Sequence, residues 1–365
     1  MVSEHEAMGR AIALAARGLG TTSPNPVVGC LLLSADGEVV GEGFHAYAGG
    51  PHAEIVALAQ AGQRAKGGTA VVTLEPCNHT GRTGPCSQAL ITAGIERVVI
   101  AVDDPTTVAA GGTDTLRSAG VQVETGVRRG EAEAGNVAWL TAVRRGRPYL
   151  TWKFAATLDG RSAAADGTSQ WITSAPARSD VHLLRSTVDA IIAGVGTVLA
   201  DDPQLTVRNL SDGTCAIRQP LRVVVDSRGR TPETARVRDN TAPSWIATTA
   251  ELGAGPDGRT DLSALLTALY ARGVRSALLE GGPTLAGAFL AAGLVDQVIG
   301  YLAPKLLGAG PAALAGAGVA TIAEALELDL TDLTQIGPDL RFTASLRHKP
   351  ADHPSHHPEP EGKAF

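Results

Sequence analysis

The spacing of apolar residues alternates between two periods along the first half of the chain, and each period predicts one type of element. Helical spacing predicts helices over 8–19, 53–61, 87–93, 113–118 and 131–145. Short apolar runs predict strands over 69–74, 97–102 and 121–124, and two runs joined across Ala35-Asp36-Gly37 predict a hairpin over 29–33 and 38–41. This alternation predicts an α/β domain with helices packed on the faces of a sheet.

A polar break at Arg144-Arg145-Gly146-Arg147-Pro148 precedes a second series of the same kind. Strands are predicted over 149–155, 190–193, 221–225, 276–279, 297–302 and 342–346, and helices over 177–186, 262–272 and 285–292. We therefore expect domains over 1–145 and 148–348. The tail 349–365 is rich in Pro, His and Glu and nearly free of apolar residues, so we expect it to be disordered.

Composition narrows the class of protein. The 365 residues suit two domains, and 44% hydrophobic with 19% charged residues is typical of a globular protein. A net charge of −6 without a basic block favours a small-molecule partner over nucleic acid. Residues 1–10 carry acids and no apolar segment, no run is long enough to span a membrane, and four cysteines make no disulfide framework. These features predict a cytoplasmic enzyme with no membrane partner.

One pattern in the sequence predicts a chemical reaction. It consists of His52-Ala53-Glu54, Pro76-Cys77 and Pro85-Cys86. One histidine and two cysteines hold a tetrahedral zinc and leave its fourth position for water. The start of a helix favours a thiolate at Cys86. Glu54 is not a ligand in this scheme, and it takes the proton of the water and delivers it to the departing amine. The prediction is one Zn²⁺ per chain, bound by His52, Cys77 and Cys86.

Plainer interpretations exist for each part of this pattern. A single His-x-Glu is close to chance in a chain of this length, and buried cysteines are common in cores. The order of the motifs and their positions at element boundaries favour zinc. Eight residues, 78–85, separate the two cysteines, whereas the common deaminase pattern has two.

The longer spacing belongs to a more specific resemblance. The segments 75–86 (Glu-Pro-Cys-Asn-His-Thr-Gly-Arg-Thr-Gly-Pro-Cys), 25–29, 43–45 and 50–54 closely resemble the deaminase domain of the bifunctional riboflavin-biosynthesis deaminase/reductase family. The segments 153–161, 169–174, 194–203 and 279–285 resemble its reductase domain. The resemblance covers the chain to about Lys349. It implies a cytidine-deaminase-like first domain and a dihydrofolate-reductase-like second domain.

The chemistry implied by the resemblance is a pair of consecutive steps. Zinc-dependent hydrolysis removes the 2-amino group of a diamino-ribosylamino-pyrimidinone 5′-phosphate, and NADPH then reduces the ribosyl group to ribityl. By motif, Asn25, His45 and Arg82 would line the deaminase pocket, with Arg82 near the substrate phosphate. The plainer alternatives are that Asn25 only caps a turn and that Arg82 is a solvated loop charge.

The second domain lacks the G-x-G-x-x-G dinucleotide fingerprint, although 280–284 places small residues between a strand and a helix start, where phosphate approaches backbone N–H groups. The resemblance implies that NADPH binds Ala155, Trp171, Thr197, Asp201, Ser227, Gly282, Pro283, Thr284, Leu285, Ala286, Gly287 and Ala288. It implies that substrate binds Ser169, Arg185, Leu205, Arg208 and Glu280. The two arginines are suited to bidentate phosphate contacts.

Alternatives remain for this domain as well. The plainer interpretation of Arg185 and Arg208 is that they are surface charges. That of Trp171 is that it is an aromatic residue of the core. No acid for the reduction is obvious, and Lys153 or Asp201 is expected to assist hydride transfer to an open-chain imine.

Two other functions compete with the bifunctional enzyme. A monofunctional zinc deaminase with a non-catalytic second domain is the first, and a nucleic-acid-editing deaminase is the second. The acidic balance of the chain speaks against the second. The resemblance to this family also implies a homo-oligomer, either a dimer or a tetramer.

Overall fold

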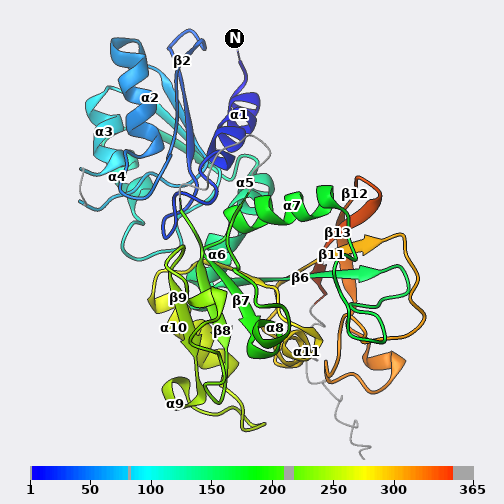
Figure 1. Cartoon of the computed structure of the whole chain (residues 1–365). Coiled ribbons are helices and arrows are strands. Elements are labelled where there is room, and N and C mark those ends of the chain that lie inside the picture. The colour runs from blue at the N-terminus through cyan, green and yellow to red at the C-terminus, as the bar shows by residue number, and fades with distance from the viewer. Residues whose placement is uncertain (1, 81–83, 209–217, 348–365) are drawn as a thin grey trace, which may run out of the picture.

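The computed structural model describes residues 2–80, 84–208 and 218–347, and places them in two α/β domains (Figure 1). The sheet of the first domain has the order β2-β1-β3-β4-β5. Its strands are β1 (Gly29–Leu33), β2 (Val39–Phe44), β3 (Thr69–Val72), β4 (Arg97–Ile100) and β5 (Gln122–Thr125). The predicted hairpin is present as the antiparallel pair β1–β2. Strands β3, β4 and β5 run parallel, so the loops after them emerge at one edge.

Helices cover both faces of this sheet because its central strands are apolar on both sides. On one face Leu32, Val72 and Val98 pack against α2 (Ala53–Ala61), α3 (Cys86–Thr92) and α4 (Gly112–Ser118). On the other face Leu31, Val71 and Val99 pack against α1 (Glu4–Ala16) and the pair α5 (Arg129–Gly135) and α6 (Val137–Arg145). Successive residues of each strand thus enter separate cores.

The helix predicted over 131–145 is wrong as a single element, because the chain divides at Asn136 into α5 and α6. Asn136 leaves the helical region at φ −117° and ψ 15°. Its side-chain oxygen accepts the Val27 N–H at 3.1 Å, and its nitrogen donates to the Val27 carbonyl at 2.7 Å. This buried pairing with a distant segment outweighs the continuation of the helix.

Helix α2 lies unusually close to β2, and glycine makes that approach possible. A Cβ atom at Gly43 would overlap the carbonyl oxygen of Ala53, and one at Gly41 would overlap that of Ala57. The helix therefore rests directly on the strand backbone. Its first turn, with His52 at the N-cap and Glu54 behind it, is held against the sheet.

The second domain contains an eight-stranded sheet of order β12-β13-β11-β6-β10-β7-β8-β9. The strands are β6 (Tyr149–Thr157), β7 (Ala190–Gly194), β8 (Leu221–Val225), β9 (Ser244–Ala247), β10 (Ser276–Leu279), β11 (Gln297–Ala303), β12 (Leu328–Ile336) and β13 (Asp339–Leu346). The six strands from β11 to β9 are parallel, and β13 and β12 add to them antiparallel. Each strand predicted in this half is present.

Helices cover both faces of this sheet too. Residues of α10 (Leu262–Ala271) and α11 (Pro283–Ala291) form one core with Trp152, Ile192 and Leu279. Helices α7 (Ala175–Ser186) and α8 (Val195–Asp201) pack on the other face. Figure 1 shows this domain below the first one.

Strands β9 and β12, helix α8 and the short α9 (Thr249–Leu252) were not among the predicted elements. Strand β12 exposes most of its residues, so apolar spacing gives a weak signal there.

A buried carboxylate of the second domain fixes the connection between the domains. Asp296 accepts hydrogen bonds from Arg145 at 2.6 Å and from both terminal nitrogens of Arg147 at 2.7 and 2.8 Å. It also accepts the Leu150 N–H at 2.8 Å. The last residue of α6 and the linker are therefore bound to the start of β6. No helix among the described residues is long and apolar enough to cross a membrane, and the tail 349–365 lies outside them.

Candidate active sites

The predicted zinc ligands come together in the first domain. The Nδ1 atom of His52 lies 3.2 Å from Cys86 Sγ and 3.5 Å from Cys77 Sγ. All three ligand atoms lie within 4.8 Å of one another, and among the described residues they form the one such group of histidine, cysteine or carboxylate atoms. Two thiols and one imidazole make a donor set that suits zinc and leaves one coordination position open.

Three elements of the domain position these ligands. His52 is the N-cap of α2, Cys86 is the first residue of α3, and Cys77 follows β3. The Cys77 carbonyl accepts the Ser87 N–H at 3.2 Å, and the Cys77 sulfur accepts the Cys86 N–H at 3.4 Å. These bonds tie the two cysteine segments together despite the eight residues between them.

Glu75 supports the Cys77 segment from behind, a role that the sequence did not reveal. Its nearly buried carboxylate accepts the Asp104 N–H at 3.1 Å and the Thr113 N–H at 2.9 Å. Thr113 is the second residue of α4, and Asp104 follows β4. The loop after β4 is thus linked through one side chain to the cysteine loop, which follows the neighbouring parallel strand β3.

Glu54 is buried beside the ligands, with 3% of its surface exposed. Burial raises the pKa of its carboxyl to about 7, because the charged form loses its hydration. A group of this pKa exchanges protons readily near neutral pH. The pKa of the Cys77 thiol is lowered, chiefly by a hydrogen bond from Cys86, and that favours the thiolate that a metal requires.

Asn25 and His45 lie next to the cluster. The His45 ring packs edge-on against that of His52, with 5.4 Å between centroids. His45 Nδ1 lies 3.0 Å from the Pro51 carbonyl, so it carries the proton, and Nε2 accepts from the Asn25 amide at 3.3 Å. Burial lowers the pKa of His45, so its ring is neutral. Arg82 lies outside the described residues.

The second site is a cavity of about 1820 Å³ in the second domain. It lies where β6, β10, β7 and β8 end, and Ala155, Gly194, Ser227 and Glu280 from those strand ends line it. Open parallel sheets bind ligands at this edge. The volume exceeds the several hundred Å³ of a typical single-ligand pocket and leaves room for a dinucleotide beside a second molecule.

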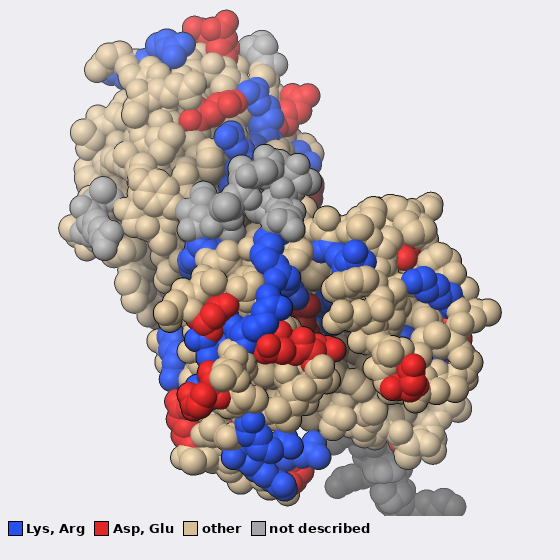
Figure 2. All heavy atoms as spheres, viewed as in Figure 1, with Lys and Arg blue, Asp and Glu red and all other residues tan. Residues whose placement is uncertain are grey.

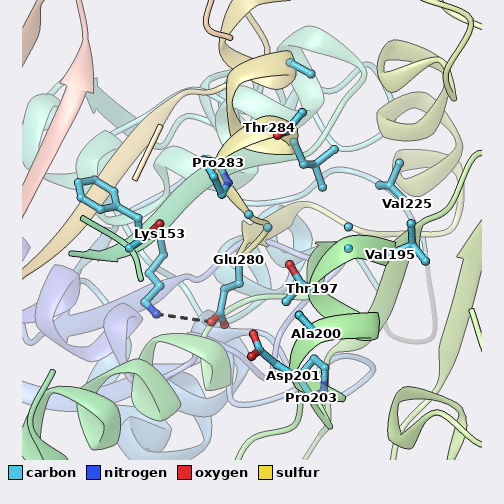
Figure 3. A pocket seen from close by; sticks show the side chains of 18 of the residues that line it. Lys153, Val195, Thr197, Ala200, Asp201, Pro203, Val225, Glu280, Pro283 and Thr284 are labelled. Carbon is cyan, nitrogen blue, oxygen red and sulfur yellow. Dashed lines mark ion pairs between the residues drawn. The ribbon is translucent and has the colours of Figure 1, made fainter. Parts of the chain in front are cut away.

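A buried ionic network forms one wall of this cavity (Figure 3). The Glu280 carboxylate accepts hydrogen bonds from Nε and Nη2 of Arg185 at 2.6 and 3.0 Å. Lys153 Nζ lies 3.6 Å from the same carboxylate. The two cations hold the pKa of Glu280 at about 2 against the effect of burial. Burial lowers the pKa of Lys153. Figure 3 shows the Lys153 and Glu280 side chains meeting, with the Asp201 carboxylate of α8 directed toward the same region.

The structure changes the interpretation of the two substrate arginines. Arg185 directs its paired nitrogens to Glu280 and donates Nη1 to the Thr206 carbonyl at 3.1 Å, so its bidentate face is not open to a phosphate. It is also not a surface charge, because its side chain is only 13% exposed. Arg208 is exposed and contacts Gln204 at 3.0 Å, so it is the arginine of the pair that is available to a ligand.

Most of the residues predicted to contact NADPH or substrate line the cavity. These are Ala155, Ser169, Trp171, Arg185, Thr197, Asp201, Leu205, Arg208, Ser227, Glu280, Gly282, Pro283, Thr284, Leu285 and Ala288. Ala286 and Gly287 do not, because the periodicity of α11 turns both into the protein interior. Trp171 is 63% exposed, so the alternative of a core aromatic is wrong. Leu205 is buried and has a left-handed φ of 51°. This backbone conformation costs energy in any residue other than glycine.

The sequence reasoning missed several cavity residues, among them His182 and Tyr301. His182 lies three residues before Arg185 on α7, a spacing that places both on one face and could have indicated it. Burial and the neighbouring arginines lower the pKa of His182 to about 4, so its ring is neutral. Tyr301 comes from β11 and donates to Asp180 at 2.6 Å, and no local pattern connects it to the other lining residues.

The residues at this edge fit a dinucleotide cofactor. Gly281 and Gly282 leave the backbone open where α11 begins, and Pro283 at the first helical position removes an N–H that would have no helical partner. The start of α11 therefore presents backbone and a favourable dipole to a diphosphate. Thr197 of α8 faces Gly282 across the groove.

A metal-binding deaminase domain followed by a dinucleotide-dependent reductase domain is the class of protein that these sites define. Residues 1–102 match the cytidine and deoxycytidylate deaminase zinc-binding region, and residues 148–342 match the RibD C-terminal domain. The riboflavin biosynthesis protein RibD of Escherichia coli is 46% identical over 91% of this chain and 96% of its own length. The chain belongs to the RibD family of riboflavin biosynthesis proteins.

Solved structures agree with this assignment. RibD of Acinetobacter baumannii superposes with a TM-score of 0.87 at 42% identity, covering 94% of this chain and 99% of its own. A Thermotoga maritima structure, described as a diaminohydroxyphosphoribosylaminopyrimidine deaminase/5-amino-6-(5-phosphoribosylamino)uracil reductase, has a TM-score of 0.85 at 34% identity with the same coverage. The predicted two-domain α/β fold, the pairing of deaminase and reductase, and the cofactors zinc and NADPH are confirmed. A non-catalytic second domain is not favoured.

The zinc ligand set makes a direct prediction about metal content. Cys77→Ser should lower bound zinc from one per chain to well below half after dialysis against a weak chelator, because one thiolate is lost from a site of three protein ligands. Cys30→Ser is the matched control, since Cys30 is a buried free cysteine of the same domain outside the cluster. Equal zinc in both variants, measured by elemental analysis, would contradict the assignment.

Proposed function

We propose that this enzyme first deaminates 2,5-diamino-6-ribosylamino-4(3H)-pyrimidinone 5′-phosphate and then reduces the ribosyl side chain of the product with NADPH. The observation that carries this proposal is the joint presence, in one chain, of a His52–Cys77–Cys86 cluster beside buried Glu54 and a dinucleotide-sized cavity at a parallel sheet edge. The description of the Thermotoga maritima relative names the same two activities.

In the deamination, Glu54 carries the proton. Zinc held by His52, Cys77 and Cys86 would supply an activated water at the open coordination position. Glu54 takes a proton from the attacking water and delivers it to the leaving amine, and its raised pKa suits both directions of transfer. Asn25 and the neutral His45 present polar groups to the pyrimidine, and we assign Arg82 to the substrate phosphate.

For the reduction, we place the NADPH diphosphate at Gly282 and the start of α11. Ala155, Trp171, Thr197, Asp201 and Ser227 contact other parts of the cofactor. Arg208 binds the substrate phosphate, whereas Arg185 acts through Glu280 by holding its carboxylate in place. Ser169 and Leu205 complete the substrate wall.

Lys153 is the proton donor that the structure favours for this step. Its ammonium group is held by Glu280 at the cavity wall, and burial lowers its pKa toward the range in which it can release a proton. Asp201 is exposed at the end of α8 and lines the cavity, and we assign it to cofactor contact rather than to proton transfer.

We also propose that the enzyme is cytoplasmic, that its deaminase domain ends at Arg145 and that its reductase domain begins at Pro148. Free thiols at Cys30, Cys77 and Cys86 suit a reducing compartment.

The reductase sheet supports a further part of the proposal, a homo-oligomer. Leu328, Leu330 and Leu333 of edge strand β12 are 39%, 60% and 60% exposed. They pair with Leu346, Ala344 and Phe342, so a bulge at Thr331 keeps all three on the face that forms the main core. The strand thus extends an apolar sheet face beyond its covering helices. We propose that a second copy of the chain covers it, because an edge strand with its own apolar face suits a two-fold contact.

A split assay on Glu54→Gln tests the two-site mechanism. We expect ammonia release from the diaminopyrimidine to fall about 1000-fold, while zinc content and NADPH oxidation on supplied deaminated product are unchanged. Glu38→Gln, an exposed glutamate of the same domain, should behave as wild type. Ammonia release without any NADPH oxidation by the wild type would instead indicate a monofunctional deaminase.

The pH dependence of NADPH oxidation separates Lys153 from Asp201. If Lys153 donates the proton, the rate falls as pH rises through its pKa, and the fall begins below the pKa of about 10.4 of an ordinary lysine because burial lowers it. Lys153→Met should lower the rate about 100-fold and remove this alkaline fall. Asp201→Asn should keep it. The reverse pattern would identify Asp201 as the donor.

The oligomer has its own test. Leu330→Asp combined with Leu333→Asp should convert the assembly to monomers in sedimentation velocity, because two charges cannot be buried unpaired in an apolar contact. Val108→Asp, at a residue 73% exposed in the first domain, should leave the assembly unchanged. An unchanged sedimentation coefficient in the β12 variant would show that the contact lies elsewhere.

A further inference from the structure

A group of arginines lies at one end of the reductase cavity, apart from the ionic network already described. Arg228 and Arg230 belong to the turn that follows β8, and Arg259 comes from the loop before α10. All three line the cavity. Figure 2 shows basic side chains gathered at the lower end of this domain, in the region where Figure 1 places the loops near β8 and α9.

The turn that carries Arg228 and Arg230 is well fixed. Asp226, which is fully buried, accepts the Thr231 N–H and hydroxyl, both at 2.7 Å. Gly229 turns the chain with φ 65°. Ser227 Oγ accepts the Thr260 N–H at 3.0 Å and the Thr260 hydroxyl at 3.1 Å, which joins the turn to the neighbouring loop. The two arginines therefore project from a backbone that the protein has already ordered.

Neither guanidinium bonds to another residue in the described part of the chain. Among the described residues, Arg228 and Arg230 have no side-chain hydrogen bond or ion pair, and both are exposed. Arg259 lies 3.7 Å from Asp257, so part of its charge is compensated. Among the described residues Asp226 forms no ion pair with Arg228 or Arg230, and its buried Oδ2 accepts hydrogen bonds from Thr231 instead. This end of the cavity thus offers two unpaired arginines to a ligand.

The sheet topology relates this end to the cofactor. Strand β7 separates β8 from β10, and neighbouring strands lie about 4.8 Å apart. The ends of β8 and β10 are therefore roughly 10 Å apart. A dinucleotide whose diphosphate lies after β10, at Gly282, reaches the turn after β8 with one of its two ribosides. In the opposite direction the cavity leads to Lys153 on β6, where reduction takes place.

We propose that Arg228 and Arg230 bind the 2′-phosphate of NADPH and make the reductase select NADPH over NADH. This inference rests on the proposed position of the cofactor diphosphate. The nicotinamide must face Lys153 and the substrate, so the adenosine half lies toward β8. A 2′-phosphate carries nearly two negative charges at neutral pH, and arginine pairs with such a group through parallel hydrogen bonds. The 2′-hydroxyl of NADH offers no charge for these arginines.

Cofactor binding to the full chain tests the proposal without relying on turnover. The dissociation constants of NADPH and of NADH are measured by nicotinamide fluorescence. The proteins compared are wild type, Arg228→Gln, Arg230→Gln and the double variant. We expect each single change to weaken NADPH binding about 10-fold and the double change about 100-fold. NADH binding should change by less than about 3-fold. In competition, 2′,5′-ADP should displace NADPH from wild type better than 5′-AMP, and the double variant should remove that advantage.

Arg347→Gln is the matched control, because Arg347 is an exposed arginine of the same domain that does not line the cavity. The pair Arg228→Lys and Arg230→Lys should restore much of the NADPH affinity, which separates loss of charge from loss of folding. An unchanged NADPH-to-NADH ratio in the double variant, or a collapse of the ratio in Arg259→Gln alone, would overturn the proposal. Wild type that binds neither dinucleotide would overturn the proposed reductase function itself.

Discussion

Parallel strand pairing is the constraint on which both functional regions of this protein depend. In each domain it brings the loops after several strands to one edge of a sheet. In the first domain the loops after β3 and β4 meet there, and the Glu75 carboxylate joins them through Asp104 and Thr113. In the second, the ends of β6, β10, β7 and β8 surround a single cavity. Residues far apart in the chain become neighbours for this reason.

Buried charge plays a different part in each domain. Glu54 stands beside the cysteines, and burial raises the pKa of its carboxyl to a value suited to proton transfer. Glu280 is also buried, but Arg185 and Lys153 hold its pKa at about 2, so it remains a carboxylate that fixes a lysine at the cavity wall. Similar burial thus produces a titrating group in one domain and a permanent anion in the other, because only Glu280 has two cations against it.

Several features were accessible to sequence reasoning because they are local. The helix over 53–61 and the strands over 221–225 and 276–279 have the predicted bounds, since their apolar spacing acts within the segment and Gly62 ends the helix. The zinc ligands were identified for the same reason, as each lies at an element boundary marked by proline or by a helix start. The division at Asn136 was not accessible, because its cause is a pair of hydrogen bonds to Val27, 109 residues earlier.

The residue types at the sites, their order and their family were determined by the sequence alone. Tertiary structure decided how those residues are used. Arg185 and Arg208 look alike in sequence, yet Glu280 occupies the first and leaves the second open. Ala286 and Gly287 lie within the predicted cofactor segment, yet the helix turns them into the interior. A side chain's role depends on which charges and surfaces the fold places around it, and those partners come from distant parts of the chain.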